Sequence, residues 1–105
     1  MNKIIIRMVL NTEDEERLEE VKQTLLSQKN LGMENISFSP MRPYFRYADY
    51  GEISISLNIK EESVEDLKNY LSSYWQGEYE DDLETDQIMG TLFHPNVYYM
   101  NLQIL

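Results

Sequence analysis

The sequence contains no cysteine and only one histidine. The missing cysteine excludes disulfide bonds, thiolate metal sites and a cysteine nucleophile, and it suits a reducing compartment such as the cytoplasm. The single histidine, His94, has no serine nucleophile elbow or metal-ligand spacing around it. We therefore expect a cytoplasmic protein that is not an enzyme, with His94 in a turn formed with Pro95 and Asn96.

Long apolar runs and glycine-rich loops are missing as well. No stretch reaches the ~18 consecutive apolar residues that a membrane-spanning helix needs. The short apolar run at residues 4–10 is interrupted by Arg7 and followed by acids, unlike a secretory signal peptide. The four glycines are isolated, which excludes a glycine-rich phosphate-binding loop. We predict no membrane contact, no cofactor and no metal site.

Basic residues are scarce. Nine lysines and arginines stand against nineteen acids, which gives a formal net charge of −10. A field of this sign disfavours direct binding of nucleic acid and favours basic proteins. The chain is 105 residues long and 42% hydrophobic, which is ordinary for one globular domain. We expect a single α+β domain over residues 1–105.

Periodicity predicts four strands and two helices. Apolar and polar residues alternate at 3–10, 35–39, 52–60 and 97–104, as in strands. One helix is predicted from a capping box at Thr12 to about Gln28, and another from Ser63 to about Trp75, before Gly77. Residues 87–93 are a candidate for one more short strand.

The order β-α-β-β-α-β favours a ferredoxin-like sandwich, with an antiparallel sheet, two helices on one face and an acidic insertion before the last strand. The amphipathic helices and the third strand are predicted to form one core. Its members are Leu18, Val21, Leu25, Ile53, Ile55, Leu57, Leu67 and Leu71.

The acidic segment at residues 78–86, EYEDDLETD, holds six carboxylates and no base. In an extended conformation its acids at even positions would all share one face. The spacing does not fit a calcium loop, and nearby aromatic residues are typical anchors of protein interfaces. The predicted partner-binding surface comprises Trp75, Glu78, Tyr79, Glu80, Asp82, Glu84 and Asp86. The alternative is a solvated edge whose charge prevents aggregation.

Two further surfaces are candidates for binding. The segment from Met41 to Tyr50 mixes aromatic residues with two arginines, and we interpret it as a hairpin or protein interface rather than a base-stacking platform. The predicted uncovered sheet face could bind a ligand or a second subunit. It would carry Ile5, Val9, Ser37, Ser39, Ser54, Ser56, Tyr99 and Asn101.

The favoured function is a small acidic protein-binding module that neutralises a basic partner. This function fits an immunity protein, an antitoxin or a phage inhibitor. The basic partner would be a nuclease-type toxin or another nucleic-acid-binding protein. A bacterial or phage source is compatible with the richness in Asn, Ile, Tyr, Lys and Glu. The alternative is a dimeric ferredoxin-like domain that binds a small ligand or regulates. A third hypothesis is an acid–base enzyme that uses His94 with a nearby carboxylate.

Overall fold

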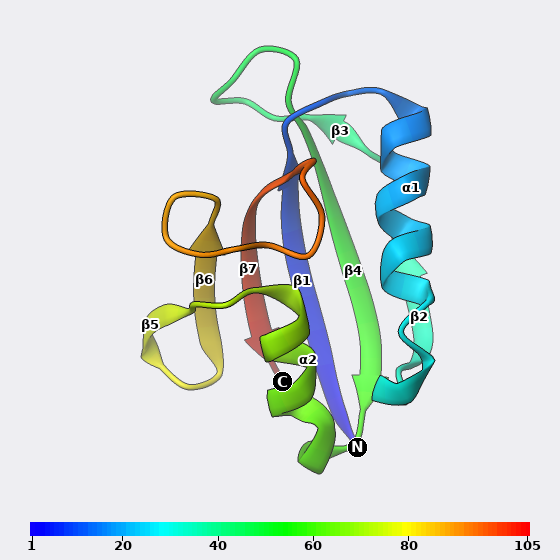
Figure 1. Ribbon diagram of the computed structural model, residues 1–105, viewed down its shortest axis with the longest axis vertical. Helices are drawn as coiled ribbons and strands as arrows, with labels where there is room; N and C mark the ends of the chain where they lie inside the picture. Colours follow the sequence, from blue (N-terminus) through cyan, green and yellow to red (C-terminus); the bar gives the residue numbers. More distant parts are fainter.

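The computed structural model describes residues 1–105 and has two α-helices and a seven-stranded antiparallel sheet. The helices lie over one face of the sheet (Figure 1). The helices are α1 (Glu15–Leu26) and α2 (Val64–Leu71), with short 3₁₀ helices at η1 (Lys29–Leu31) and η2 (Glu61–Ser63). The strands are β1 (Asn2–Leu10), β2 (Glu34–Phe38), β3 (Arg42–Pro43), β4 (Gly51–Ile59), β5 (Gln76–Tyr79), β6 (Asp82–Asp86) and β7 (Val97–Ile104).

The strand order is β2-β4-β1-β7-β6-β5, and β3 pairs with one end of β4. The predicted α+β class and antiparallel sheet are confirmed. The order is not that of a simple ferredoxin-like sandwich, because the sheet has seven strands. The acidic segment, expected as an insertion, forms most of the β5–β6 hairpin and extends the sheet beyond β7, at the edge opposite β2 (Figure 1).

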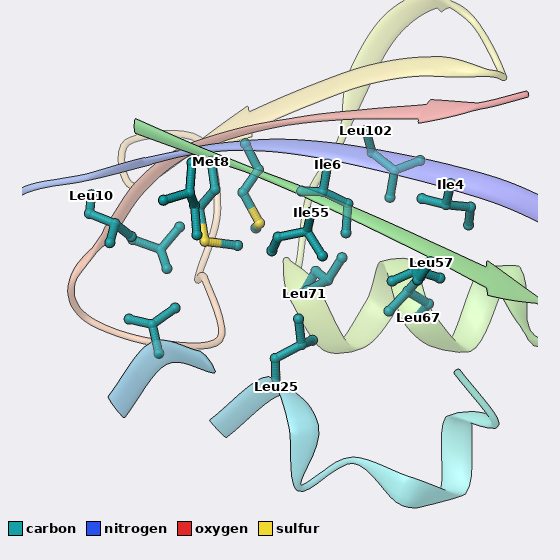
Figure 2. Close-up of a cluster of buried hydrophobic side chains, with 14 of the residues drawn as sticks. Ile4, Ile6, Met8, Leu10, Leu25, Ile55, Leu57, Leu67, Leu71 and Leu102 are labelled. Carbon is teal, nitrogen blue, oxygen red and sulfur yellow. The ribbon is translucent and has the colours of Figure 1, made fainter. Parts of the chain in front are cut away.

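The core lies between the sheet and the helices. Seventeen buried apolar side chains form one cluster, and all eight residues predicted from periodicity belong to it. Figure 2 shows that the side chains of Ile4 and Ile6 of β1 lie on the side of the sheet that α2 covers with Leu67 and Leu71. The apolar side chains at alternate positions of the strands therefore pack against the apolar faces of both helices on one side of the sheet.

Both helices differ from prediction at one end. The N-cap of α1 is Asp14, whose Oδ1 accepts the Glu16 backbone N–H at 2.9 Å, whereas the Thr12 hydroxyl accepts the N–H of Asp14. Helix α2 ends at Leu71, before the expected Trp75. Ser72 is extended at φ −155° and ψ 148°, and its hydroxyl oxygen accepts the backbone N–H of Tyr74. A serine hydroxyl competes in this way with helical hydrogen bonding.

Residues 87–93 form a turn and a loop rather than the candidate strand. The loop crosses the end of α2, where Phe93 N–H donates to the Leu71 carbonyl at 3.0 Å and a single bridge joins Leu92 to Ser72. The expected turn at residues 94–96 is confirmed by a hydrogen bond from Val97 N–H to the His94 carbonyl at 3.1 Å.

Gly77 lies inside β5 and does not end a helix. A Cβ atom there would lie 2.5 Å from the carbonyl oxygen of Asp82 on the paired strand. Glycine therefore permits the close approach of the two strands at the irregular register of the hairpin. Neither helix of the fold has the length and apolar character needed to cross a bilayer.

Candidate functional site

The sheet face opposite the helices, here called the open face, is bordered by carboxylates. Directly paired residues of antiparallel strands point to the same face, so side chains form rows from β4 through β1 and β7 to β6. The three rows are Ser56-Ile5-Gln103-Asp82, Ser54-Arg7-Asn101-Glu84 and Glu52-Val9-Tyr99-Asp86. Each row ends on an acid of β6.

These three carboxylates are held in place by neutral donors. The Asn101 side-chain amide donates to Asp82 Oδ1 at 2.9 Å, and the Tyr99 hydroxyl donates to Glu84 Oε2 at 2.9 Å. Asp86 Oδ1 accepts two backbone N–H groups of the following turn, both at 2.9 Å. The other oxygen of each carboxylate makes no hydrogen bond within the chain, so each acid is oriented yet retains a free acceptor.

None of the six carboxylates in residues 78–86 forms a salt bridge. The four salt bridges of the structure involve Glu52, twice, and two helical pairs elsewhere. The β5–β6 hairpin therefore carries a negative charge that the chain itself leaves uncompensated.

The prediction that five acids share one face is wrong, because the chain reverses at Glu80 and Asp81. Asp82, Glu84 and Asp86 lie together on the open face. Glu80 instead helps line a shallow hollow on the helix side. That hollow is also lined by Asn2, Glu61, Val64, Glu65, Lys68, Asp81 and Ile104.

The other predicted site residues divide between structural and accessible positions. Trp75 is half-buried against the core, and its indole N–H donates to the Lys68 carbonyl at 2.9 Å. It is therefore a part of the fold rather than a free anchor. Glu78 is exposed on β5. Tyr79 is 66% exposed and pairs with Asp82, which places it on the open face.

The aromatic segment, residues 44–50, folds against one end of the open face. Its Tyr47 and Tyr50 rings meet the Tyr98 ring with centroid distances of 5.7 and 5.4 Å. A hollow of about 360 Å³, here called the aromatic hollow, lies beside it. Its lining residues are Arg7, Tyr44, Phe45, Arg46, Tyr47, Glu84, Asp86, Tyr98 and Tyr99.

In the sequence the aromatic segment and the acidic segment are two separate features. Their meeting in space depends on which strand β6 joins and in which register. Arg7, also missed, is recognisable in the sequence only as the one charge within the apolar run of β1.

Fixed charges and hydrogen bonds define the electrostatics of the aromatic hollow. The Arg7 guanidinium is 2.9 Å from a Glu52 carboxylate oxygen and lies over the Tyr99 ring, 5.3 Å from its centroid. Burial raises the pKa of Tyr99 to about 12, with a further contribution from its hydrogen bond to the Glu84 carboxylate. Tyr99 therefore remains a protonated donor at neutral pH, and Arg7 shares the Glu52 carboxylate with Arg42.

His94 lies in its turn with Nδ1 accepting the Asn96 N–H at 3.1 Å. Burial lowers the pKa of His94, so the neutral form that can accept this bond is favoured. No group of three or more histidine or acidic side chains converges in a way that could hold a metal ion.

No family profile matches the sequence, and no curated protein or solved structure shows significant similarity to it. The geometry and charge of the open face are therefore the basis for assigning a function.

Proposed function

We propose that this protein is a small acidic binding module whose β5–β6 hairpin and open face bind and neutralise a basic protein. An immunity protein, an antitoxin or a phage inhibitor acts in this manner. The observation that carries the proposal is the absence of any salt bridge to the six carboxylates of residues 78–86. Clustered like charges repel one another, so the fold gains little from them, whereas a basic partner would relieve the repulsion.

The carboxylates of β6 are suitably prearranged for such a partner. Alternate residues of a strand lie about 7 Å apart, so Asp82, Glu84 and Asp86 form a row of roughly 13 Å. Two of them are oriented by Tyr99 and Asn101. Side chains that are already ordered lose less entropy on binding, which favours a specific contact over a diffuse charge effect.

The partner we propose is a protein with a basic contact surface, such as a nuclease-type toxin. The net charge of −10 disfavours nucleic acid itself. Complementary charge mainly raises the association rate. Added salt shortens the Debye length and so screens the attraction between the two proteins. Association should therefore be fast at low ionic strength and slow as salt is added.

The test uses the partner captured from the native host by the full chain, followed by binding kinetics. The variant is the triple change Glu78→Lys, Glu80→Lys and Asp82→Lys, all at exposed positions of the hairpin. Glu84 is left intact because it holds Tyr99. We expect association to slow by roughly tenfold or more at low salt.

The matched control changes net charge equally at exposed sites away from the hairpin, with Glu13→Lys, Glu19→Lys and Glu62→Lys. A location-specific patch predicts a much smaller effect for this control. Equal slowing by both triples would reduce the effect to net charge, and unchanged association of the hairpin triple would overturn the proposal. So would a captured partner with an acidic contact surface.

The alternative we propose is a dimeric ferredoxin-like domain that regulates or binds a small ligand. It is favoured by the order β2-β4-β1-β7, which we interpret as a ferredoxin-like unit enlarged by β3, β5 and β6. A second hollow on the open face, lined by Ile5 and serines of β2 and β4 among other residues, is a place for a ligand or second copy. Sedimentation equilibrium at several concentrations tests it. A monomer throughout would remove the dimer, which the shared negative charge already opposes.

A further inference from the structure

We propose that the aromatic hollow binds the guanidinium group of an arginine side chain presented by the basic partner. This inference rests on the proposed function and assigns to it a specific anchoring position. The hollow combines aromatic walls with two oriented carboxylates, which is the combination that a planar organic cation requires.

The walls are aromatic rings with unusual exposure for their size. Phe45 is 82% exposed and Tyr47 is 45% exposed. The segment is nevertheless ordered by its own packing, since Tyr44 lies 5.2 Å from Phe45 and 5.9 Å from Tyr47 between ring centroids. These rings offer apolar faces to a ligand without a rearrangement of the segment.

The structure already contains guanidinium groups on rings of this hollow. The Arg7 guanidinium lies 5.3 Å from the centroid of Tyr99, and that of Arg46 lies 5.4 Å from the centroid of Phe45. Both distances fall within the range of cation–π attraction. These contacts show that guanidinium groups pack on rings of this hollow, and they leave Tyr44, Tyr47 and Tyr98 without such a contact.

The carboxylates of Glu84 and Asp86 supply the hydrogen-bond acceptors. One oxygen of each is occupied, by the Tyr99 hydroxyl and by backbone N–H groups of the turn, respectively. The remaining oxygens have no partner in the chain. A guanidinium carries five N–H donors in a plane, so one arginine can bond to both acids while it stacks on a ring.

The surroundings of the hollow favour a cation over an anion. Its lining holds two arginines, Arg7 and Arg46, and two acids, Glu84 and Asp86. Glu52 is shared between Arg7 at 2.9 Å and Arg42 at 3.9 Å. The acids of residues 78–86 have no salt bridge, and the chain carries a net charge of −10, so the field around the hollow attracts a cation. An arginine is also preferred to a lysine, because its guanidinium is less strongly hydrated than an ammonium and stacks on aromatic faces.

The test titrates N-acetyl-arginine amide into the isotope-labelled full chain and follows backbone and side-chain NMR shifts. We expect a dissociation constant of about 1 mM, as for a small ligand with few contacts, with the largest shifts at Tyr98 and Tyr99. N-acetyl-lysine amide should bind more weakly, and the uncharged N-acetyl-citrulline amide should not bind measurably.

Two variants locate the site. Glu84→Gln removes a charge but retains an acceptor for Tyr99, and it should weaken binding at least fivefold, as should Tyr47→Ala. Glu80→Gln removes the same charge from the hairpin turn and should leave binding unchanged. Equal binding of the citrulline compound, shifts confined to other surfaces, or displacement of the arginine compound by inorganic phosphate at constant ionic strength would overturn the inference.

The hairpin triple variant separates this inference from the proposed function. It leaves Glu84 and the aromatic segment intact, so it should retain binding of the arginine compound while losing association rate with the partner. Loss of arginine-compound binding in Tyr47→Ala with unchanged partner affinity would sink the arginine anchor and leave the acidic patch standing.

Discussion

The two faces of the sheet are built from the same strands and have opposite character. On β1, Ile4, Ile6 and Met8 are completely buried beneath the helices, whereas Ile5 and Arg7 between them are half-exposed on the open face. The covered face is apolar and continuous. The open face consists of rows that are polar except for Ile5 and Val9 on β1 and that end in three acids.

The alternation of side chains along each strand places the residues that stabilise the fold on one face and those available for recognition on the other. Full burial of a large aliphatic side chain contributes about 1.5–3 kcal/mol, whereas a hydrogen bond of the kind seen on the open face contributes only about 0.5–1.5 kcal/mol. Because the covered face supplies most of the stability, the open face can hold uncompensated charge. Substitutions should therefore sort by face, and the following predictions test that sorting.

The largest effect is expected at Leu71, which is completely buried beneath the sheet. Leu71→Ala should lower the free energy of unfolding by about 2–5 kcal/mol through lost transfer energy and a residual cavity. Urea denaturation measures this loss. The matched control is Ser56→Ala on the open face of β4, which should change stability by about 0.5 kcal/mol or less. Similar losses at the two positions would break the comparison.

The next effect concerns a hydroxyl pair on the covered side of β6. Ser72 and Thr85 are buried, and their hydroxyl oxygens are 2.9 Å apart. Thr85→Val should cost about 0.5–1.5 kcal/mol, because it removes one hydrogen bond of the Ser72 hydroxyl, which keeps its contacts with the Tyr74 backbone. In a double-mutant cycle, Ser72→Ala combined with Thr85→Val should cost less than the sum of the single changes. Strict additivity would show that the two hydroxyls do not interact.

A moderate effect is expected on the open face, at the bond between Tyr99 and Glu84. The Tyr99 pKa of about 12 exceeds that of an unfolded tyrosine. The contribution of protonated Tyr99 to the stability of the fold is therefore fully present below about pH 10. It is lost as the pH rises through about 12. Glu84→Gln should lower the Tyr99 pKa, measured by ultraviolet titration of the phenol. Asp82→Asn, which lies two residues away, serves as the control, and an unchanged Tyr99 pKa in Glu84→Gln would remove the assigned contribution of the carboxylate.

The smallest effect is expected at His94, in the loop on the helix side. Its pKa is lowered by burial, so its contribution to stability is present above the unfolded value of about 6.5 and is lost as the pH falls through the folded value. His94→Asn should lower the free energy of unfolding by less than about 1 kcal/mol at pH 8. It should also reduce the loss of stability that occurs as the pH falls. Partner binding should stay within about threefold, because His94 lies near Arg17 and Glu20 of α1, away from the carboxylates of residues 78–86. A hundredfold loss of activity with the fold intact would favour the enzyme hypothesis instead.

Much of the covered side was predictable because it depends on local periodicity. The stripe through Leu18, Val21 and Leu25 and the alternation of β4 identify the core without knowledge of the sheet order. The errors arose where a distant partner overrides a local preference. Helix α2 ends early, before Ser72. The Ser72 hydroxyl bonds to the nearby backbone of Tyr74 and also to Thr85 of β6, and the Ser72 backbone is bridged to Leu92. The last two partners are distant in sequence.

The candidate site was predictable only in composition. The acids of residues 78–86 are evident in the sequence, but a two-residue turn separates Glu80 from the row on β6. Trp75 appears in the sequence to be an interface anchor, yet its N–H is used by the Lys68 carbonyl. The aromatic segment is equally evident, but it lines one hollow with Glu84 and Asp86, which are distant in the chain.

The sequence alone therefore determined the charge, the α+β class, the core residues and the presence of an acidic and an aromatic segment. Each of these follows from composition or from the period of a helix or strand, which are local properties. Only the tertiary structure decided that β5 and β6 extend the sheet, that three acids border one face, and that aromatic rings and carboxylates meet in one hollow. These features depend on strand register, and register is fixed by pairing between segments far apart in the chain.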